Sequence, residues 1–217
     1  MHAKTQRSAP AVRAVLFDFG GVVAEEGFRD GLRAIASSQG LDPEAVAEAA
    51  VDAVYESGYV TGHGAQSEFW ALLRQRTGLQ GDPRAWEREI LTRFRVRDWM
   101  LDWVRRLRRA GYRTALVTDQ TDWLERLDER HAFLARFDRI FNSYRIGKGK
   151  RDPTLFDDVL RELNVAPDQA LLVDDAPDNL ARACDRGLRV LHFVDRAGFE
   201  SEMAKLLDAP SPPETHE

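Results

Sequence analysis

The sequence has little cysteine, no long apolar run and no excess of positive charge. Its single cysteine, Cys184, excludes an intramolecular disulfide and favours a reducing compartment. No segment is apolar over the length of a membrane span, and the N-terminal sequence MHAKTQRSAPAVRAV lacks the apolar stretch of a signal peptide. We therefore expect a cytoplasmic protein with no membrane partner.

The charge balance is mildly acidic. The chain has 31 Lys and Arg residues against 36 Asp and Glu residues, a net charge of −5. This balance gives no electrostatic reason to expect nucleic acid as a partner. Residues 105–109 are locally basic, and their spacing predicts the polar face of an amphipathic helix. With 43% hydrophobic and 31% charged residues, the composition is typical of a globular protein.

Strand and helix patterns alternate on both sides of a purely helical block. Residues 12–19 predict a buried strand, and the last clear strand covers residues 188–194. The helical block comprises residues 28–38, 43–57, 65–77 and 83–96, with N-caps at Asp42-Pro43 and Asp82-Pro83. The later elements are helices at 98–110, 121–135, 153–163 and 177–186, and strands at 112–118, 139–142 and 170–173.

Strands separated by helix-length segments imply right-handed crossovers and a mostly parallel sheet. The predicted fold is therefore α/β and Rossmann-like, with helices on both faces of the sheet and a small all-helical insertion. We expect a core of residues 11–23 and 97–207 and a helical cap of residues 24–96. The polar, proline-rich ends, residues 1–10 and 208–217, are predicted to be disordered.

Acidic and hydroxyl side chains follow three of the predicted strands. They are Asp18, the pair Thr118-Asp119, and the pair Asp174-Asp175. Since ligands of open α/β sheets bind beyond the carboxyl ends of the strands, these side chains should meet in one crevice. The loop after Asn142 adds Lys148 and Lys150, two of only four lysines in an arginine-rich chain.

Several carboxylates in one crevice repel each other unless a cation joins them. Magnesium suits such a site, since it takes one or two carboxylates together with substrate phosphate. A carboxylate nucleophile would then split phosphoester hydrolysis into two easier steps. Taken singly, each acid is more often a turn or cap residue, and Asp174-Asp175 before Pro177 could cap a helix.

Four segments resemble the motifs of the haloacid dehalogenase superfamily, in which a helical cap lies between the first and second motifs. They are Phe17-Asp18-Phe19-Gly20-Gly21-Val22-Val23, Leu116-Val117-Thr118, the run from Ser143 through Lys150 to Asp152-Pro153, and Val173-Asp174-Asp175 through Asn179. The glycine-containing first motif is similar to that of bacterial sugar-1-phosphate phosphatases. The resemblance implies a magnesium-dependent phosphatase that acts on a small phosphorylated metabolite through an aspartyl-phosphate on Asp18.

The resemblance also implies roles for matching residues. Asp18 would be the nucleophile, and Thr118 and Lys150 would assist catalysis. Substrate would be bound by Thr118, Asp119 and Lys150. Magnesium would be held by Asp18, the Gly20 carbonyl, Asp174 and Asp175. Lys148 is the alternative for the lysine role, although its spacing to Asp152-Pro153 fits less well.

Three positions depart from the family pattern. Gly20 stands where most phosphatases of the family carry a general acid/base aspartate, so we expect slow turnover, a good leaving group such as that of a sugar 1-phosphate, or a substitute acid. Asp119 replaces the usual asparagine and is interpreted as a structural carboxylate pointing away, or as a displaced acid. Arg151 replaces a proline, which should loosen the loop.

Two other functions stay open at this point. A binding or regulatory protein without turnover would explain the three departures. A 2-haloacid dehalogenase needs no general acid, but Asp174-Asp175 has no purpose in expelling halide. The helical cap offers Glu25, Glu26, Phe28, Tyr59, His63 and Trp70 as residues that could line the entrance, each with an ordinary structural alternative. We expect a monomer or a homodimer.

Overall fold

The computed structural model describes residues 11–208, which contain a five-stranded parallel sheet of order β3-β2-β1-β4-β5. The strands are β1 (Ala14–Phe17), β2 (Arg113–Thr118), β3 (Arg139–Asn142), β4 (Ala170–Asp174) and β5 (Arg189–His192). The central strand, β1, pairs with β2 on one side and with β4 on the other. This arrangement confirms the predicted α/β class and its parallel sheet.

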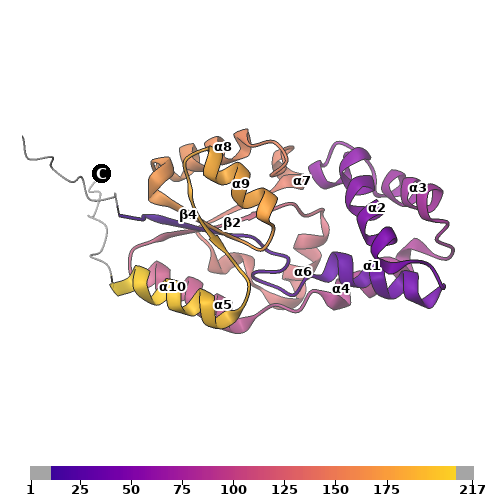
Figure 1. Ribbon diagram of the computed structural model, residues 1–217, viewed down its shortest axis with the longest axis horizontal. Helices are drawn as coiled ribbons and strands as arrows, with labels where there is room; N and C mark the ends of the chain where they lie inside the picture. The colour runs from indigo at the N-terminus through magenta and orange to yellow at the C-terminus, as the bar shows by residue number, and fades with distance from the viewer. Residues whose placement is uncertain (1–10, 209–217) are drawn as a thin grey trace, which may run out of the picture.

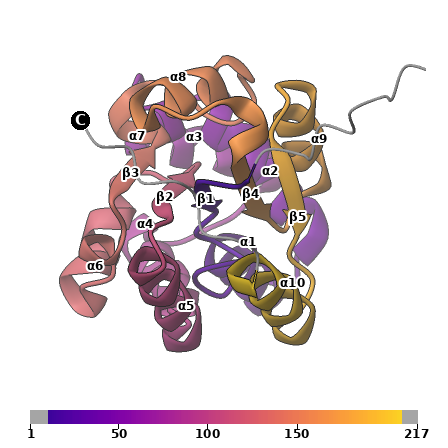
Figure 2. The ribbon, with the colours of Figure 1, turned by 90° about the vertical axis from the view of Figure 1, so that its left-hand side faces the viewer.

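Helices cover both faces of the sheet, as Figure 2 shows. One face carries α5 (Asp98–Arg109), α6 (Trp123–His131) and α10 (Arg196–Asp208), and the other carries α8 (Thr154–Leu163) and α9 (Pro177–Asp185). The residues of β1 are fully buried and alternate between the two hydrophobic clusters. Val15 and Phe17 pack towards α5 and α10, whereas Ala14 and Leu16 pack towards α8 and α9. A strand buried on both faces explains the continuous apolar run in the sequence.

Four helices and one 3-10 turn separate β1 from α5, and we call residues 27–93 the helical insertion. The elements are α1 (Gly27–Ser38), α2 (Pro43–Glu56), η1 (Tyr59–Thr61), α3 (Gln66–Thr77) and α4 (Pro83–Arg93). The predicted caps are present, since the carboxyl groups of Asp42 and Asp82 accept hydrogen bonds from backbone N–H groups of their helices. The helical insertion lies beyond one end of the sheet (Figure 1).

Two linkers connect the helical insertion to the sheet, and they pair with each other. Glu25 N donates to Arg95 O at 2.9 Å, and Arg97 N donates to Val23 O at 2.9 Å. The helix predicted to reach residue 96 therefore ends at Arg93, because the following residues extend to make this pairing. The Arg97 guanidinium also donates to the carbonyl of Val22 at 2.7 Å, which braces the loop after β1.

One helix was not predicted from the sequence. In α10, Phe199 and Met203 are buried against the sheet one helical turn apart, but Gly198 weakens the helical signal. The short elements η1 (Tyr59–Thr61), α7 (Ser143–Ile146) and η3 (Pro167–Gln169) were also not predicted. The helix predicted over residues 121–135 is divided into α6 and the 3-10 turn η2 (Leu134–Arg136). The expected tails lie outside the described residues, except for Asp208, which ends α10. No helix within residues 11–208 has the length and apolarity needed to cross a membrane.

Candidate active site

The candidate site lies where β1, β2 and β4 end, facing the helical insertion. Asp18 directly follows β1, and its backbone N donates to Val173 O on β4 at 3.0 Å. Thr118 and Asp174 are the last residues of the adjacent strands β2 and β4. Because these strands are parallel and β1 lies between the other two, residues more than 100 positions apart come together.

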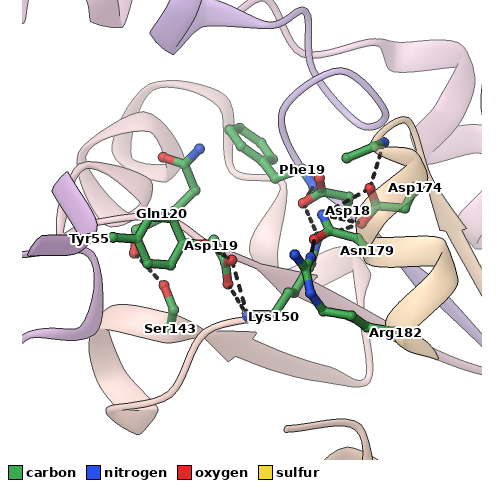
Figure 3. Close-up of polar contacts among 11 residues, drawn as sticks. Asp18, Phe19, Tyr55, Asp119, Gln120, Ser143, Lys150, Asp174, Asn179 and Arg182 are labelled. Atoms are coloured by element: carbon green, nitrogen blue, oxygen red, sulfur yellow. Dashed lines mark hydrogen bonds and ion pairs between the residues drawn. The ribbon is translucent and has the colours of Figure 1, made fainter. Parts of the chain in front are cut away.

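Lys150 is the only lysine that the described structure places in this cluster. Its Nζ lies 2.8 Å from Asp18 Oδ1 and 2.7 Å from Asp174 Oδ2, and its side chain is only 1% exposed. Figure 3 shows Asp18, Asp174 and Asn179 gathered around the ammonium end of Lys150. Lys148 instead pairs with Asp158 on the surface of α8. The geometry therefore favours Lys150 over Lys148 for the role of the family lysine.

The two carboxyl oxygens of Asp18 have different surroundings. Oδ1 accepts from the backbone N of Phe19 at 2.7 Å and is paired with Lys150. Among the described residues, Oδ2 has no hydrogen-bond donor. The Asp18 side chain is 13% exposed and lines a cavity. One oxygen is thus held by the protein, while the other is available to a ligand.

Asp174 is fixed by donors other than the lysine. Its Oδ1 accepts from Ala176 N at 2.9 Å and from Asn179 Nδ2 at 3.2 Å. Ala176, at the N-cap position of helix α9, makes no side-chain capping hydrogen bond. The bond from Ala176 N satisfies a backbone N–H at the start of α9, as the helix-cap alternative expects, and the contacts with Lys150 and Asn179 are additional to it. The backbone turn and Asn179 aim the Asp174 carboxylate into the cluster.

Three carboxyl groups and one ammonium leave an excess of negative charge. Oxygens of Asp18, Asp174 and Asp175 all lie within 4.8 Å of one another. Burial raises the pKa of Asp18 to about 8; Lys150 opposes this rise and Asp174 adds to it. Burial and Asp174 likewise raise the pKa of Asp175. Burial disfavours the charged form of Lys150, but Asp174 and Asp18 outweigh it and raise the pKa of the ammonium.

This donor set fits a hard divalent cation, which takes oxygen ligands and offsets their mutual repulsion. The loop after β1 is shaped to leave room for the third carboxylate. Gly21 has φ +82°, and a Cβ there would clash with the Asp175 carboxyl group. Glycine at this position thus satisfies both the backbone conformation and the space beside Asp175.

Asp119 lies beside the loop that carries Lys150, not away from the site. Both of its oxygens accept from Lys150 N, at 2.9 and 3.1 Å, and Tyr55 Oη on α2 donates to Oδ2. The interpretation of Asp119 as a structural carboxylate pointing away is therefore wrong in its direction. Both oxygens of Asp119 are therefore already bonded to protein groups. A substrate would compete with these groups for Asp119, which was predicted to bind it.

Arg151 connects the loop that carries Lys150 to helix α2. Its guanidinium stacks on the Tyr55 ring at 3.8 Å from the centroid and lies 3.4 Å from Asp52. These contacts offset at least part of the constraint that is lost with the proline ring, so the expected loosening of the loop stays a prediction.

A cavity of about 290 Å³ separates the cluster from the helical insertion. The sheet side of its wall includes Asp18, Gly20, Thr118, Lys150 and Asp175. Among the described residues, the Thr118 hydroxyl has no hydrogen-bond partner, so it can bind a ligand oxygen. The helical insertion contributes Phe28, Arg29, Val51, Val54, Tyr55 and Val60, and Glu26 lies just before it.

Of the six entrance residues considered from the sequence, only Glu26 and Phe28 line this cavity. Tyr59 and Trp70 are buried, Glu25 pairs with Arg97, and His63 lies beside Gly147. Sequence reasoning missed Tyr55 and Arg97. Tyr55 lies 64 residues before its partner Asp119, so no local pattern could reveal the pair.

Position 20 has room for a side chain. A Cβ built on Gly20 lies 3.7 Å from Glu26 Oε1, 3.7 Å from Phe94 and 3.8 Å from Gln120, all ordinary contact distances. The backbone there is also outside the left-handed region that glycine favours. Glycine at this position is therefore not demanded by sterics.

The sequence matches the family model for haloacid dehalogenase-like hydrolase over residues 12–183. The chain belongs to this family. Bifunctional epoxide hydrolase 2 from Rattus norvegicus is 28% identical over 114 residues, which is 49% of this chain but only 20% of the rat protein. The chain thus spans only a small part of the curated relatives that it matches.

Solved structures share the fold over almost the whole chain. A predicted HAD-like hydrolase from Porphyromonas gingivalis has a TM-score of 0.68 at 21% identity, covering 92% of this chain and 99% of the other. The family enzyme bt-2542 from Bacteroides thetaiotaomicron, in complex with magnesium and inorganic phosphate, has a TM-score of 0.64 at 18% identity, covering 84% and 94%. A phosphatase and a dehalogenase also share the fold, so the fold alone does not distinguish these reactions.

Proposed function

We propose that this protein is a magnesium-dependent phosphomonoesterase of small phosphorylated metabolites, and that Asp18 is its nucleophile. The observation that carries the proposal is the position of Lys150 Nζ, 2.8 Å from Asp18 and 2.7 Å from Asp174, in a cluster of three carboxylates that opens into a cavity. A nucleophile and a buried ammonium beside carboxylates that can bind a divalent cation are a combination suited to phosphoryl transfer.

Each residue of the site has its own role in the proposed reaction. The free oxygen of Asp18 attacks phosphorus and the ester P–O bond breaks, so that the phosphoryl group becomes attached to Asp18. The leaving group departs as an oxyanion that takes a proton from solvent. Lys150 holds the other Asp18 oxygen and offsets negative charge on the phosphoryl oxygens. The Thr118 hydroxyl donates to one of these oxygens. Water then attacks phosphorus and the bond from phosphorus to the Asp18 oxygen breaks. Inorganic phosphate leaves with the water oxygen and its protons shared with solvent, and the Asp18 carboxylate is restored.

Asp18, Asp174, Asp175 and the Gly20 carbonyl would hold the magnesium ion. When bound, magnesium would offset the charge of the carboxylates and of the phosphate. The P. gingivalis and B. thetaiotaomicron proteins support the fold, and the magnesium and phosphate in the latter agree with this assignment. The helical insertion would serve as the cap, since its residues form the far wall of the cavity.

The substrate must be small and must have a good leaving group. A cavity of about 290 Å³ is at the lower end of the range for small-molecule sites, roughly 300–1,000 Å³. Glycine at position 20 supplies no acid for the leaving oxygen, so an anomeric hydroxyl, as in a sugar 1-phosphate, suits the site better than an ordinary alcohol. Dehalogenation is less well supported, because displacement of halide from carbon does not require a cation site, and so it does not explain the three clustered carboxylates.

We expect the purified protein to hydrolyse an aryl phosphate only when magnesium is present. An aryl leaving group needs no proton, so this substrate bypasses the missing acid at Gly20. Asp18→Asn should lower turnover by several orders of magnitude, because the amide cannot attack phosphorus. Release of the phenol is followed by absorbance. Equal rates for the wild type and the folded Asp18→Asn variant would refute the proposal.

Magnesium alone should raise the midpoint of thermal unfolding. A cation that binds only the folded protein adds about 2.7 kcal/mol at a concentration 100 times its Kd, or roughly 5–10 °C for a chain of this size. Asp174→Asn should remove most of this increase, whereas Asp158→Asn on the surface of α8 should keep it. Differential scanning fluorimetry with and without magnesium measures both. An increase of the same size in both variants would place the ion elsewhere.

A further inference from the structure

Asp119 holds the backbone of the residue that carries the buried ammonium. Both of its oxygens accept from Lys150 N, and a Cβ on the preceding residue, Gly149, would lie only 3.0 Å from Asp119 Oδ1. The absence of a side chain at Gly149 therefore allows this close approach. A lysine side chain has four rotatable bonds, so a fixed backbone position limits where its ammonium can lie.

The same carboxylate is bound from the helical insertion. Tyr55 Oη donates to Asp119 Oδ2, and the Tyr55 ring lies under the guanidinium of Arg151, the next residue after Lys150. Asp52, almost one helical turn before Tyr55, pairs with that guanidinium. Figure 3 shows Asp119 between Tyr55 and Lys150. Residues 147–153, which carry Lys150, are called the lysine loop. Helix α2 thus contacts this loop directly at Arg151 and indirectly through Asp119, which accepts from the backbone N of Lys150.

The charges favour this chain of contacts. Burial and the adjacent Asp119 carboxylate raise the pKa of Tyr55, which keeps its hydroxyl a donor. Without Asp119, the N–H of Lys150 would lose the acceptor that the structure gives it, inside a residue only 1% exposed. The two positions that depart from the family pattern in this region, Asp119 and Arg151, therefore belong to one contact between α2 and the lysine loop.

We propose that Asp119 is a positioning residue, which links the seating of helix α2 on the sheet to the placement of the Lys150 ammonium between Asp18 and Asp174. The catalytic consequence rests on the proposed phosphatase function, while the mechanical link does not. When α2 lies over the cavity, Tyr55 and Asp119 hold the loop and the ammonium stays in place. When α2 lifts, the loop loses these contacts and Lys150 becomes free to leave the cluster.

The exposure of Lys150 to an amine-modifying reagent tests the link without any substrate. In the folded wild type, Lys148 and Lys205 should react, whereas Lys150 should be protected. Tyr55→Phe removes one hydroxyl and should raise the modification rate of Lys150 by about tenfold, the effect of one lost hydrogen bond on the open population. Asp119→Ala should raise it further, and adding Tyr55→Phe to that variant should change nothing more. Mass spectrometry of the peptides measures each lysine separately.

Tyr59→Phe is the matched control. Tyr59 Oη also links the helical insertion to the core, but its partner is Asp122, directly before α6, and not Asp119. Modification of Lys150 should stay at the wild-type rate in this variant. Equal rates in Tyr55→Phe and Tyr59→Phe would overturn the proposal, even if Asp119→Ala fails to fold.

Aryl phosphate kinetics provide the second measurement. Tyr55→Phe should lower kcat and leave KM nearly unchanged, because Lys150 acts on the reacting groups and α2 keeps its other contacts. Asp119→Asn keeps one acceptor oxygen and should recover part of the activity that Asp119→Ala loses. Absence of hydrolysis in the wild type would refute the phosphatase function alone, since Lys150 modification would still decide the positioning role.

Discussion

Replacing Gly20 by aspartate should raise the turnover of alkyl phosphates by about 10²-fold or more, the usual contribution of general acid–base catalysis. The site holds the proposed nucleophile Asp18, a buried lysine and the carboxylates proposed to bind a cation, and position 20 has no side chain that could donate a proton. A Cβ there meets nothing closer than 3.7 Å, so the substitution should be tolerated. Burial near other carboxylates should raise the pKa of the new group and favour the protonated form.

The comparison of two substrates makes this prediction specific. Hydrolysis of an aryl phosphate should change little, since its leaving group needs no proton, and Gly20→Asn should show no gain with either substrate. Steady-state kinetics of both esters measure the ratio. An unchanged rate with the alkyl ester would contradict the prediction and would indicate that another group already supplies the proton. Glu26, whose pKa is raised by burial, is the carboxyl group nearest to position 20.

Replacing Lys150 by methionine should lower the free energy of unfolding by about 3–5 kcal/mol in metal-free buffer, the typical loss when one partner of a buried ion pair is removed. The side chain is 1% exposed and contacts two carboxylates. Methionine has a similar length, so the loss of charge and not of volume dominates. Three carboxylates would then remain within 4.8 Å of one another with no cation.

Chemical denaturation of three variants separates this effect from general damage. Lys148→Met removes an exposed ion pair and should change the free energy of unfolding by less than about 1 kcal/mol. The double variant Lys150→Met with Asp18→Asn should recover part of the loss, because one uncompensated carboxylate disappears. Magnesium should also stabilise Lys150→Met more than it stabilises the wild type. Equal losses in the two lysine variants would show that burial of Lys150 carries no special electrostatic role.

Local signals explain why the elements were predicted well and why one was missed. Asp42-Pro43 and Asp82-Pro83 predicted the starts of α2 and α4, because a cap and a proline act within one turn of the chain. The predicted end of α4 was three residues too late. Its last turn is replaced by pairing with the linker before α1, a contact that lies about 70 residues away in the sequence.

The sequence by itself determined the order along the chain of the strands and of the long helices other than α10, the family, and which side chains follow the strands. These depend on hydrophobic period, caps and short motifs, all of which are local. Only the tertiary structure decided that the Lys150 ammonium lies between Asp18 and Asp174, and that Asp119 and Arg151 bind α2. Each of these facts depends on the position of the loop that carries Lys150 relative to strands and helices distant in the sequence. The packing of the whole chain sets that position.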